Sequence, residues 1–253
     1  MISTPGASTW LRIGTAGWGL PRPWRDQFPA EGSYLERYAA RFSAVEINSS
    51  FYRQHRRAVY AGWAAAVPTS FRFAVKVPRA ITHDQMLVAS DVLLEVFLEE
   101  ATGLGNRLGP LLVQLPPSLA FDAGDVEGFL QALRRLHAGT AAFEPRHESW
   151  FDGEADALLA RHGAARVGAD PARVPAAAEP AGDGRLVYYR LHGSPKMYYS
   201  DYEPERLGDV ARRLRATAAR GADVWCILDN TTLGAATGNA LALSRMTAAV
   251  PTV

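Results

Sequence analysis

The chain of 253 residues has one cysteine, Cys226, and its 27 basic residues include only two lysines, Lys76 and Lys196. A single cysteine excludes an intramolecular disulfide and a zinc cluster built on thiolates. The lysines differ from the arginines in chemistry, because an ammonium group can release its proton or form a Schiff base and a guanidinium group cannot. The scarcity of lysine therefore makes Lys76 and Lys196 candidates for function.

Long apolar runs and a strong net charge are also absent. No stretch approaches the ~20 apolar residues that a membrane span needs, and no basic segment followed by an apolar one stands at the N-terminus. We therefore expect a cytoplasmic protein with no membrane partner. The formal net charge of +1 argues against a surface built mainly to bind polyphosphate, but a local basic patch leaves nucleic acid open as a partner.

The chain does contain eight short runs rich in apolar, β-branched or aromatic residues. They cover residues 11–16, 43–48, 71–77, 111–115, 141–144, 165–168, 186–191 and 223–228. Segments with helical periodicity lie between them, at residues 33–42, 58–67, 91–103, 123–136, 153–162, 203–220 and 235–249. Strands that alternate with helices predict parallel pairing with right-handed crossovers, and hence an α/β fold.

Eight such units favour one (β/α)8 TIM-like barrel that spans residues 1–253 as a single domain. An open doubly wound sheet is the structural alternative, and it is disfavoured because no Gly-x-Gly-x-x-Gly turn follows the first strand. Residues 170–184 are rich in Ala, Pro and Gly without helical periodicity. We therefore expect the sixth helix to be missing or replaced by a loop.

Polar and charged residues stand at or just after the ends of most of these runs. In a barrel of parallel strands the carboxyl ends lie at one rim, so these side chains are expected to converge there. Burying so many ionisable groups is costly unless they pair with one another or bind a ligand. The candidate catalytic residues at this rim are Glu46, Lys76, Glu144, His192 and Asp229.

Glu46 and Glu144 lie three strands apart and would face each other across the rim. Such a pair suits acid/base catalysis of the kind used in glycoside hydrolysis. Arg146 is close enough in sequence to keep Glu144 ionised, which favours a nucleophile or ligand role for that carboxylate. A divalent metal could also be held by Glu46, Glu144, His192 and Asp229. No His-x-His or His-Glu-x-x-His spacing supports such a site, and no motif in the sequence identifies a cofactor.

A second set of residues at the rim is expected to bind substrate. Basic side chains there could clamp an anionic group, or could instead form an internal salt-bridge network. Aromatic side chains in the loops after the strands could stack on a flat ring, or could instead pack against the helices. The basic candidates are Arg79, Arg146, Arg190 and Lys196, the aromatic ones are Trp18, Tyr52, Trp150 and Tyr199, and the other candidates are Asn48, His83, Gln114, His147 and Asn230.

Seven ordered motifs give the chain a resemblance to a known family. The sequence is similar to the YecE-like family, a group of unknown function whose known members resemble TIM barrels. The resemblance implies a barrel but carries no established activity to these residues. The motifs are GTAGW (14–18), VEINSSFY (45–52), FRFAVKVPRAITH (71–83), LGPLLVQLPPS (108–118), FEPRHESWF (143–151), YYRLHG (188–193) and LDNTTLGAATGNA (228–240).

Three functions are compatible with these patterns. The leading hypothesis is a hydrolase or lyase for an anionic, ring-containing small molecule, with Glu46 or Glu144 as general base and Lys76 or His192 as proton donor. The second is a metal-dependent phosphoesterase or isomerase. The third is a non-enzymatic protein that binds a nucleotide or single-stranded nucleic acid by stacking on aromatic residues.

Overall fold

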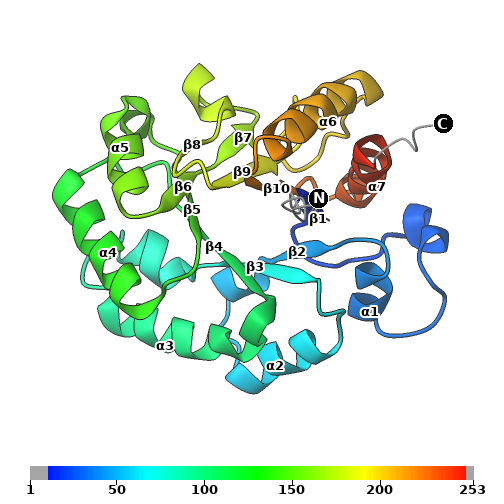
Figure 1. Ribbon diagram of the computed structural model, residues 1–253, viewed down its shortest axis with the longest axis horizontal. Helices are drawn as coiled ribbons and strands as arrows, with labels where there is room; N and C mark the ends of the chain where they lie inside the picture. The colour runs from blue at the N-terminus through cyan, green and yellow to red at the C-terminus, as the bar shows by residue number, and fades with distance from the viewer. Residues whose placement is uncertain (1–10, 249–253) are drawn as a thin grey trace, which may run out of the picture.

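The computed structural model describes residues 11–248, and the expected alternation of strands and helices is present (Figure 1). The strands are β1 (Leu11–Thr15), β2 (Ala44–Ile47), β3 (Arg72–Lys76), β4 (Leu108–Gln114), β5 (Ala141–Glu144), β6 (Ala164–Arg166), β7 (Gly168–Asp170), β8 (Ala181–Gly182), β9 (Leu186–Leu191) and β10 (Asp223–Leu228). The α-helices are α1 (Tyr34–Ala39), α2 (Arg57–Ala65), α3 (Asp91–Ala101), α4 (Ala123–Leu136), α5 (Glu154–Arg161), α6 (Pro204–Ala218) and α7 (Ala235–Thr247).

The strands form two sheets rather than one continuous ring of hydrogen bonds. One sheet has the order β1-β10-β9-β7 and is parallel, and the other has the order β2-β3-β4-β5-β6-β8 and is parallel except for β8. Among the described residues, one isolated bridge between Ala16 and Glu46 connects β1 to β2. The chain thus has a mixed α/β fold with parallel sheets, and the strands of residues 11–248 do not confirm the closed TIM-like barrel expected from the sequence.

The predicted sixth strand, residues 165–168, is split around Val167. Its first half, β6, pairs with β5, and its second half, β7, pairs with β9, so the chain changes partner at this point. As expected, no α-helix follows β7 in the described part of the chain before β9. A 3-10 turn at Pro175–Ala178 and the short antiparallel strand β8 take its place. The sequence pattern of alternating strands and helices did not predict β8.

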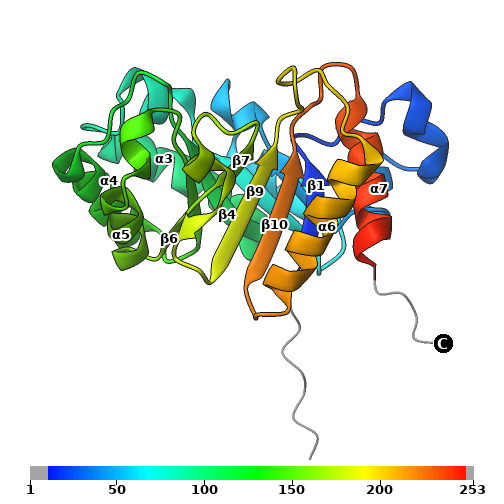
Figure 2. The same ribbon diagram turned by 90° about the horizontal axis from the view of Figure 1, so that it is seen from above.

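The inner faces of both sheets contribute to one small core. Tyr188 of β9 and Trp225 of β10 stack with their ring centroids 5.9 Å apart. The other members of this core are Ala44, Ala74, Leu112, Ala142, Ala165, Val167, Leu186 and Ile227. Side chains alternate along a strand, so Glu46, Lys76 and Glu144 follow Ala44, Ala74 and Ala142 on this inner face, each at or near the carboxyl end of its strand. Figure 2 shows β9 and β10 side by side, with α6 and α7 on the side of β10 where β1 lies.

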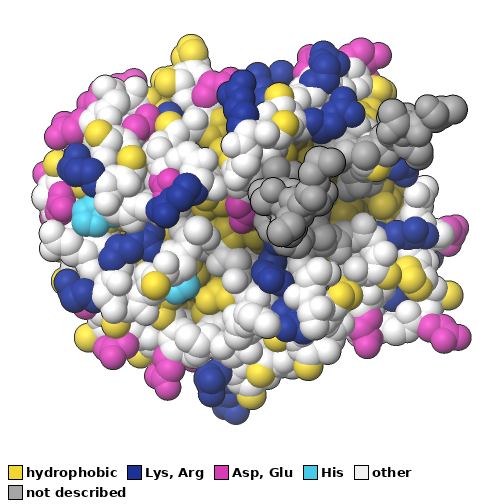
Figure 3. All heavy atoms as spheres, viewed as in Figure 1, with side chains coloured by type: hydrophobic (Ala, Val, Ile, Leu, Met, Phe, Trp, Pro, Cys, Tyr) yellow, Lys and Arg dark blue, Asp and Glu magenta, His cyan; other side chains and the backbone are white. Residues whose placement is uncertain are grey.

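The surface agrees with the near-zero net charge. On the face seen in Figure 3, basic and acidic side chains are interspersed, so neither sign dominates it. No described helix is long and apolar enough to span a bilayer.

Candidate functional site

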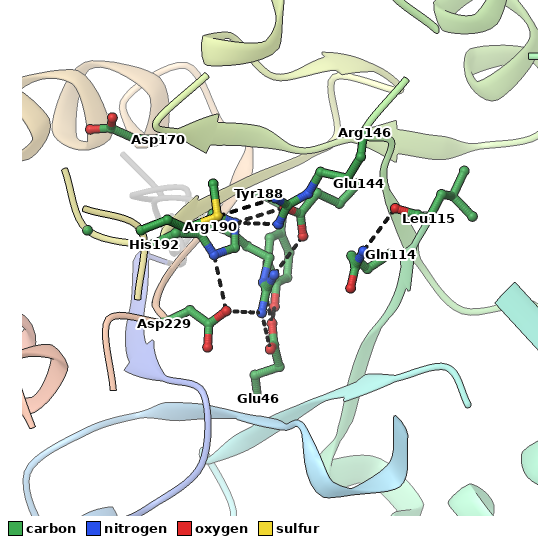
Figure 4. Close-up of polar contacts among 12 residues, drawn as sticks. Glu46, Gln114, Leu115, Glu144, Arg146, Asp170, Tyr188, Arg190, His192 and Asp229 are labelled. Atoms are coloured by element: carbon green, nitrogen blue, oxygen red, sulfur yellow. Dashed lines mark hydrogen bonds and ion pairs between the residues drawn. The ribbon is translucent and has the colours of Figure 1, made fainter. Parts of the chain in front are cut away.

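Arg190 lies at the centre of a buried cluster of charged side chains (Figure 4). Its Nε and Nη2 donate to the two carboxylate oxygens of Glu46 at 3.0 and 2.8 Å. Its Nη1 donates to Glu144 Oε2 at 2.6 Å, and Nη2 also donates to Asp229 Oδ2 at 3.0 Å. One guanidinium group therefore binds carboxylates from β2, from β5 and from the end of β10, which are distant in sequence. The structure brings together the strand ends that the sequence pattern places at one rim.

The protonation states in this cluster follow from burial and pairing. Burial alone would raise the pKa of Glu144, but the charges of Arg190, Arg146 and His192 outweigh it and hold that pKa well below its ordinary value. Burial also raises the pKa of Asp229, and Arg190 with the hydrogen bond from His192 reverses that effect, so the pKa is lowered. Both carboxylates are ionised at neutral pH as a result.

Glu46 is fully buried and has a second donor besides Arg190. The Tyr188 hydroxyl donates to Glu46 Oε2 at 3.0 Å, and burial together with the Glu46 charge raises the pKa of Tyr188 well above its ordinary value. Tyr188 was not among the predicted site residues. The alternation of β9 could have identified it, because Tyr188, Arg190 and His192 stand two residues apart and share one face.

His192 lies between Glu144 and Asp229. Its Nε2 is 2.8 Å from Glu144 Oε1 and its Nδ1 is 3.1 Å from Asp229 Oδ2, while Arg146 Nη2 is 3.1 Å from Nε2. As an imidazolium the ring donates to both carboxylates. As a neutral ring protonated on Nδ1 it donates to Asp229 and accepts from Arg146. Each ring nitrogen therefore has a polar partner.

Lys76 differs from the other cations of the cluster. Within residues 11–248 no carboxylate forms an ion pair with its ammonium group, which instead lies 4.0 Å from the centroid of the Phe51 ring. The residue is 6% exposed. Burial, followed by the positive charge of Arg190, lowers the pKa of Lys76 to about 8, because the carboxylates Glu46 and Glu144 compensate only in part.

The loop after β9 covers part of the cluster. Met197 Sδ accepts from Arg146 Nη1 at 3.7 Å, and the Tyr198 ring packs edge-on against His192 with centroids 5.5 Å apart. The loop is held by the segment after β10, since Asn230 Nδ2 donates to Ser200 O at 2.9 Å. Met197 was not predicted, and no spacing in the sequence indicates that this loop folds back over His192.

Several predicted binding residues lie near the cluster. Asn48 is half-buried on the face that carries Glu46, and its Oδ1 accepts no hydrogen bond from the described residues. His83 packs edge-on against Phe51 with centroids 4.9 Å apart, and burial followed by the charge of Lys76 lowers its pKa. Gln114 stands at the end of β4 and donates to Leu115 O at 2.9 Å, beside the cluster in Figure 4.

Other predicted residues make structural contacts away from the cluster. Trp150 is fully buried and its indole N–H donates to Leu119 O at 3.0 Å, so it cannot stack on a ligand. Trp18 packs edge-on against Trp63 at 5.1 Å, on the helix side of the sheet. His147 caps the turn at Glu148–Phe151. The loops after these strands fold outward onto the helices, which alternation within the strands does not indicate.

The remaining basic and aromatic candidates lie on the surface. Arg79 pairs with Asp84 at 3.1 Å with more than half of its side chain exposed. Lys196 Nζ lies over the ring of Tyr199, 4.2 Å from its centroid, and Tyr52 is largely exposed. Only Arg146 and Arg190 of the predicted anion clamp belong to the cluster.

The metal interpretation finds no ligand set in this arrangement. Across residues 11–248, no group of three or more His, Cys, Asp or Glu side chains is placed to hold a metal ion. The physical reason is that Arg190 occupies oxygens of all three carboxylates, and both nitrogens of His192 face those same carboxylates.

The fold and the cluster define an α/β protein in which interlocked charged side chains gather at the carboxyl ends of parallel strands. A family model described as a protein of unknown function, DUF72, matches residues 12–252, so the chain belongs to the DUF72 family. This confirms the resemblance to the YecE-like proteins.

Two curated relatives are similar in sequence. The chain is 35% identical over 82 residues to the UPF0759 protein YecE of Escherichia coli strain K12, a match that covers 32% of this chain and 30% of YecE. It thus matches less than a third of the length of that relative. It is 23% identical over 258 residues to the UPF0759 protein YunF of Bacillus subtilis strain 168, covering 90% of this chain and 92% of YunF.

Two solved structures share the fold. A DUF72 family protein from Enterococcus faecalis V583 is similar with a TM-score of 0.78 at 21% identity, covering 95% of this chain and 96% of that one. A DUF72 family protein from Thermotoga maritima MSB8 is similar with a TM-score of 0.72 at 24% identity, covering 94% and 98%. At these identities the likeness concerns the fold alone.

Proposed function

We propose that the chain is an acid–base enzyme of the hydrolase or lyase class, built on a (β/α)8-type barrel with an interrupted ladder, and that it acts on an anionic small molecule at the carboxyl ends of the strands. The observation that supports this proposal is the environment of Lys76. This residue is a nearly buried amine without an ion-pair partner among the described residues, and its pKa is lowered to about 8. A lysine in this state can exchange a proton near neutral pH.

The contacts favour Lys76 over Glu46 and Glu144 as the group that reacts. Glu46 is fully buried and Glu144 is 1% exposed, and the oxygens of both are bound by Arg190 and its neighbours. We therefore assign the two carboxylates the role of holding Arg190 and His192. In its free-amine form Lys76 takes a proton from water or substrate, and the resulting ammonium group returns that proton to the leaving group.

Asp229 and His192 are the second part of the proposed machinery. Asp229 is 7% exposed and hydrogen-bonded to His192, whose other ring nitrogen lies 2.8 Å from Glu144 Oε1. We assign this pair to proton exchange beside Lys76. Arg146, whose side chain is 9% exposed, supplies the positive charge that would bind the anionic group of the substrate.

The test is an activity screen with lysine variants. The panel contains aryl phosphates, aryl esters, aryl glycosides of acidic sugars and ring-substituted keto acids, with release of the aryl or carbonyl product as the readout. We expect at least one compound to be turned over by the wild type and by K196M, the matched control at the exposed lysine, but not by K76M. Turnover that K76M retains in full would contradict the proposal.

The pH dependence gives a second readout. The rate should rise with pH up to about pH 8, as Lys76 loses its proton, if the free amine acts first. K76R keeps the positive charge but cannot release it near this pH, so it should be as inactive as K76M. Activity of K76R comparable to the wild type would show that Lys76 supplies charge only.

A further inference from the structure

A largely apolar pocket of about 370 Å³ is lined in part by Phe51, the ring that Lys76 contacts. Its walls come from the segments that follow β2 and β3 and from one face of α2 and of α3. The apolar part of its lining includes Phe51, Tyr60, Ile81, Leu93, Val96 and Phe97. We call this space the Phe51 pocket. Nothing in the acid–base machinery described above uses it.

The size of the pocket suits a small ring system. A cavity of about 150 Å³ lined by apolar side chains is enough to hold benzene, and ligand pockets generally begin at about 300 Å³. The Phe51 pocket at about 370 Å³ can therefore receive one or two fused rings. Phe51, Tyr60 and Phe97 supply aromatic walls, which favour flat apolar groups over flexible polar ones.

Phe51 connects the pocket to the reactive amine. Its ring lines the pocket, and the Lys76 ammonium group lies 4.0 Å from its centroid. His83 contacts the same ring edge-on at 4.9 Å. A ring bound against Phe51 would therefore lie next to a side chain that Lys76 and His83 both contact. Arg79 at the pocket wall is paired with Asp84, which lines the same pocket.

The backbone of one wall is unusual. Ala80–Asp84 forms a single π-helical turn, and the residues that follow include Met86, Leu87 and Ala89 with φ of 48°, 72° and 50°. Residues other than glycine rarely adopt this left-handed backbone conformation. Both π-helical turns and strained backbone conformations are found preferentially at functional sites. The conformation shapes the wall of which Ile81 and Asp84 are part.

We propose that the Phe51 pocket is the subsite for the ring of an aromatic anion, whose acidic group extends past Phe51 toward Lys76. This inference rests on the proposed function, since it names the substrate class of the same site. It predicts specificity for compounds in which a carboxylate, or another acidic group, is attached directly to one ring or to two fused rings.

The binding test uses 2-naphthoate as the probe and NMR of the full chain with labelled Ile, Leu and Val methyl groups and labelled lysine side chains. In the wild type, naphthoate should shift the Ile81 and Leu93 methyl signals and the Lys76 side-chain signal, and leave Lys196 unchanged. V96W places an indole in the pocket from a position that is 41% exposed on α3. It should weaken binding by about tenfold or more, a size typical for the loss of an apolar contact in a ligand pocket.

The matched control is V92W, on the same helix at a position that is 72% exposed and outside the pocket lining. It should bind as the wild type does. Naphthoate that leaves Ile81 unshifted, or that binds V96W as tightly as V92W, would overturn the proposal.

The two proposals fail separately. If K76M keeps turnover in the activity screen, the proposed function fails whatever naphthoate does. If K76M loses turnover but naphthoate does not reach Ile81, only the assignment of the Phe51 pocket fails. K76M should still show the Ile81 shift with naphthoate, at a higher dissociation constant, because the ring site remains and one charge is lost.

Discussion

Replacement of Lys76 by methionine should make the protein more stable while it removes activity. The pKa of Lys76 falls from 10.5 to about 8 because its amine is buried. Each pH unit between those two values corresponds to about 1.4 kcal/mol, so carrying the charge at pH 7 costs the native state about 3 kcal/mol. Methionine has a similar length and no charge, so K76M should raise the free energy of unfolding at pH 7 by about 2–3 kcal/mol.

The sign of the pH dependence follows from proton binding. The unfolded chain keeps the lysine proton up to about pH 10.5, whereas the native protein releases it near pH 8. Between these values the unfolded state binds more protons, so the stability of the wild type rises with pH relative to that of K76M. The gap between the two proteins should therefore close as the pH goes from about 8 to 10.5.

The assay is urea unfolding of both proteins at intervals from pH 7 to pH 10.5, with K196M as the control at an exposed lysine. The difference between wild type and K76M removes the contribution of tyrosines that titrate in the same range. A destabilised K76M at pH 7, or a difference that does not change with pH, would refute the reasoning. Either result would mean that Lys76 is charged without cost in the native state.

The charged cluster around Arg190 leads to three further predictions about stability. R190M should lower the free energy of unfolding by about 3–5 kcal/mol in urea because it leaves buried carboxylates unpaired, whereas R185M, at an exposed arginine that pairs with Asp183, should change it by less than about 1 kcal/mol. Y188F should cost about 1 kcal/mol in the same assay, since Glu46 loses one of its donors. The wild type should lose stability on acidification below about pH 4.5, as the lowered pKa of Glu144 is approached, and E144Q should lose less over that range, which thermal unfolding from pH 5 to pH 3 can measure.

The sequence predicts most of the fold because the alternation typical of strands and the helical periodicity are both strong in this chain. The bounds of β5, β9, β10 and α4 agree with the predicted segments. The capping box at Ser33 and Glu36 also forms, with both reciprocal hydrogen bonds present. These features depend on local alternation and local hydrogen bonds, which can be read without knowing which strands pair.

Partner choice is the part of the fold that could not be predicted. Residues 164–170 pair with β5 in one half and β9 in the other, and only the tertiary arrangement decides where the change falls. The pairing of β8 with β6 is likewise long-range and antiparallel. Local pattern carries no information on either, which is why one unbroken ladder was expected and two sheets are found.

The candidate site divides in the same way. Residues on the strands, such as Glu46, Glu144 and Arg190, could be placed because alternation fixes their face. Residues in the loops could not, since Trp18 and Trp150 turn toward the helices while Tyr198 turns over His192. Which ionisable group is left without an ion-pair partner depends on distances between side chains, which the sequence does not give. Lys76 could therefore be named as a candidate from the sequence, but it could not be preferred over Glu46 as the group that reacts.

The central claim is that the amine of Lys76 releases its proton near neutral pH, and its titration tests this most directly. The chain has only two lysines, so NMR of protein labelled at lysine Cε and Nζ gives two side-chain signals, which K76R and K196R assign. We expect Lys76 to titrate near pH 8 and Lys196 to serve as the exposed reference in the same spectra. Titration of Lys76 above pH 10 would contradict the account.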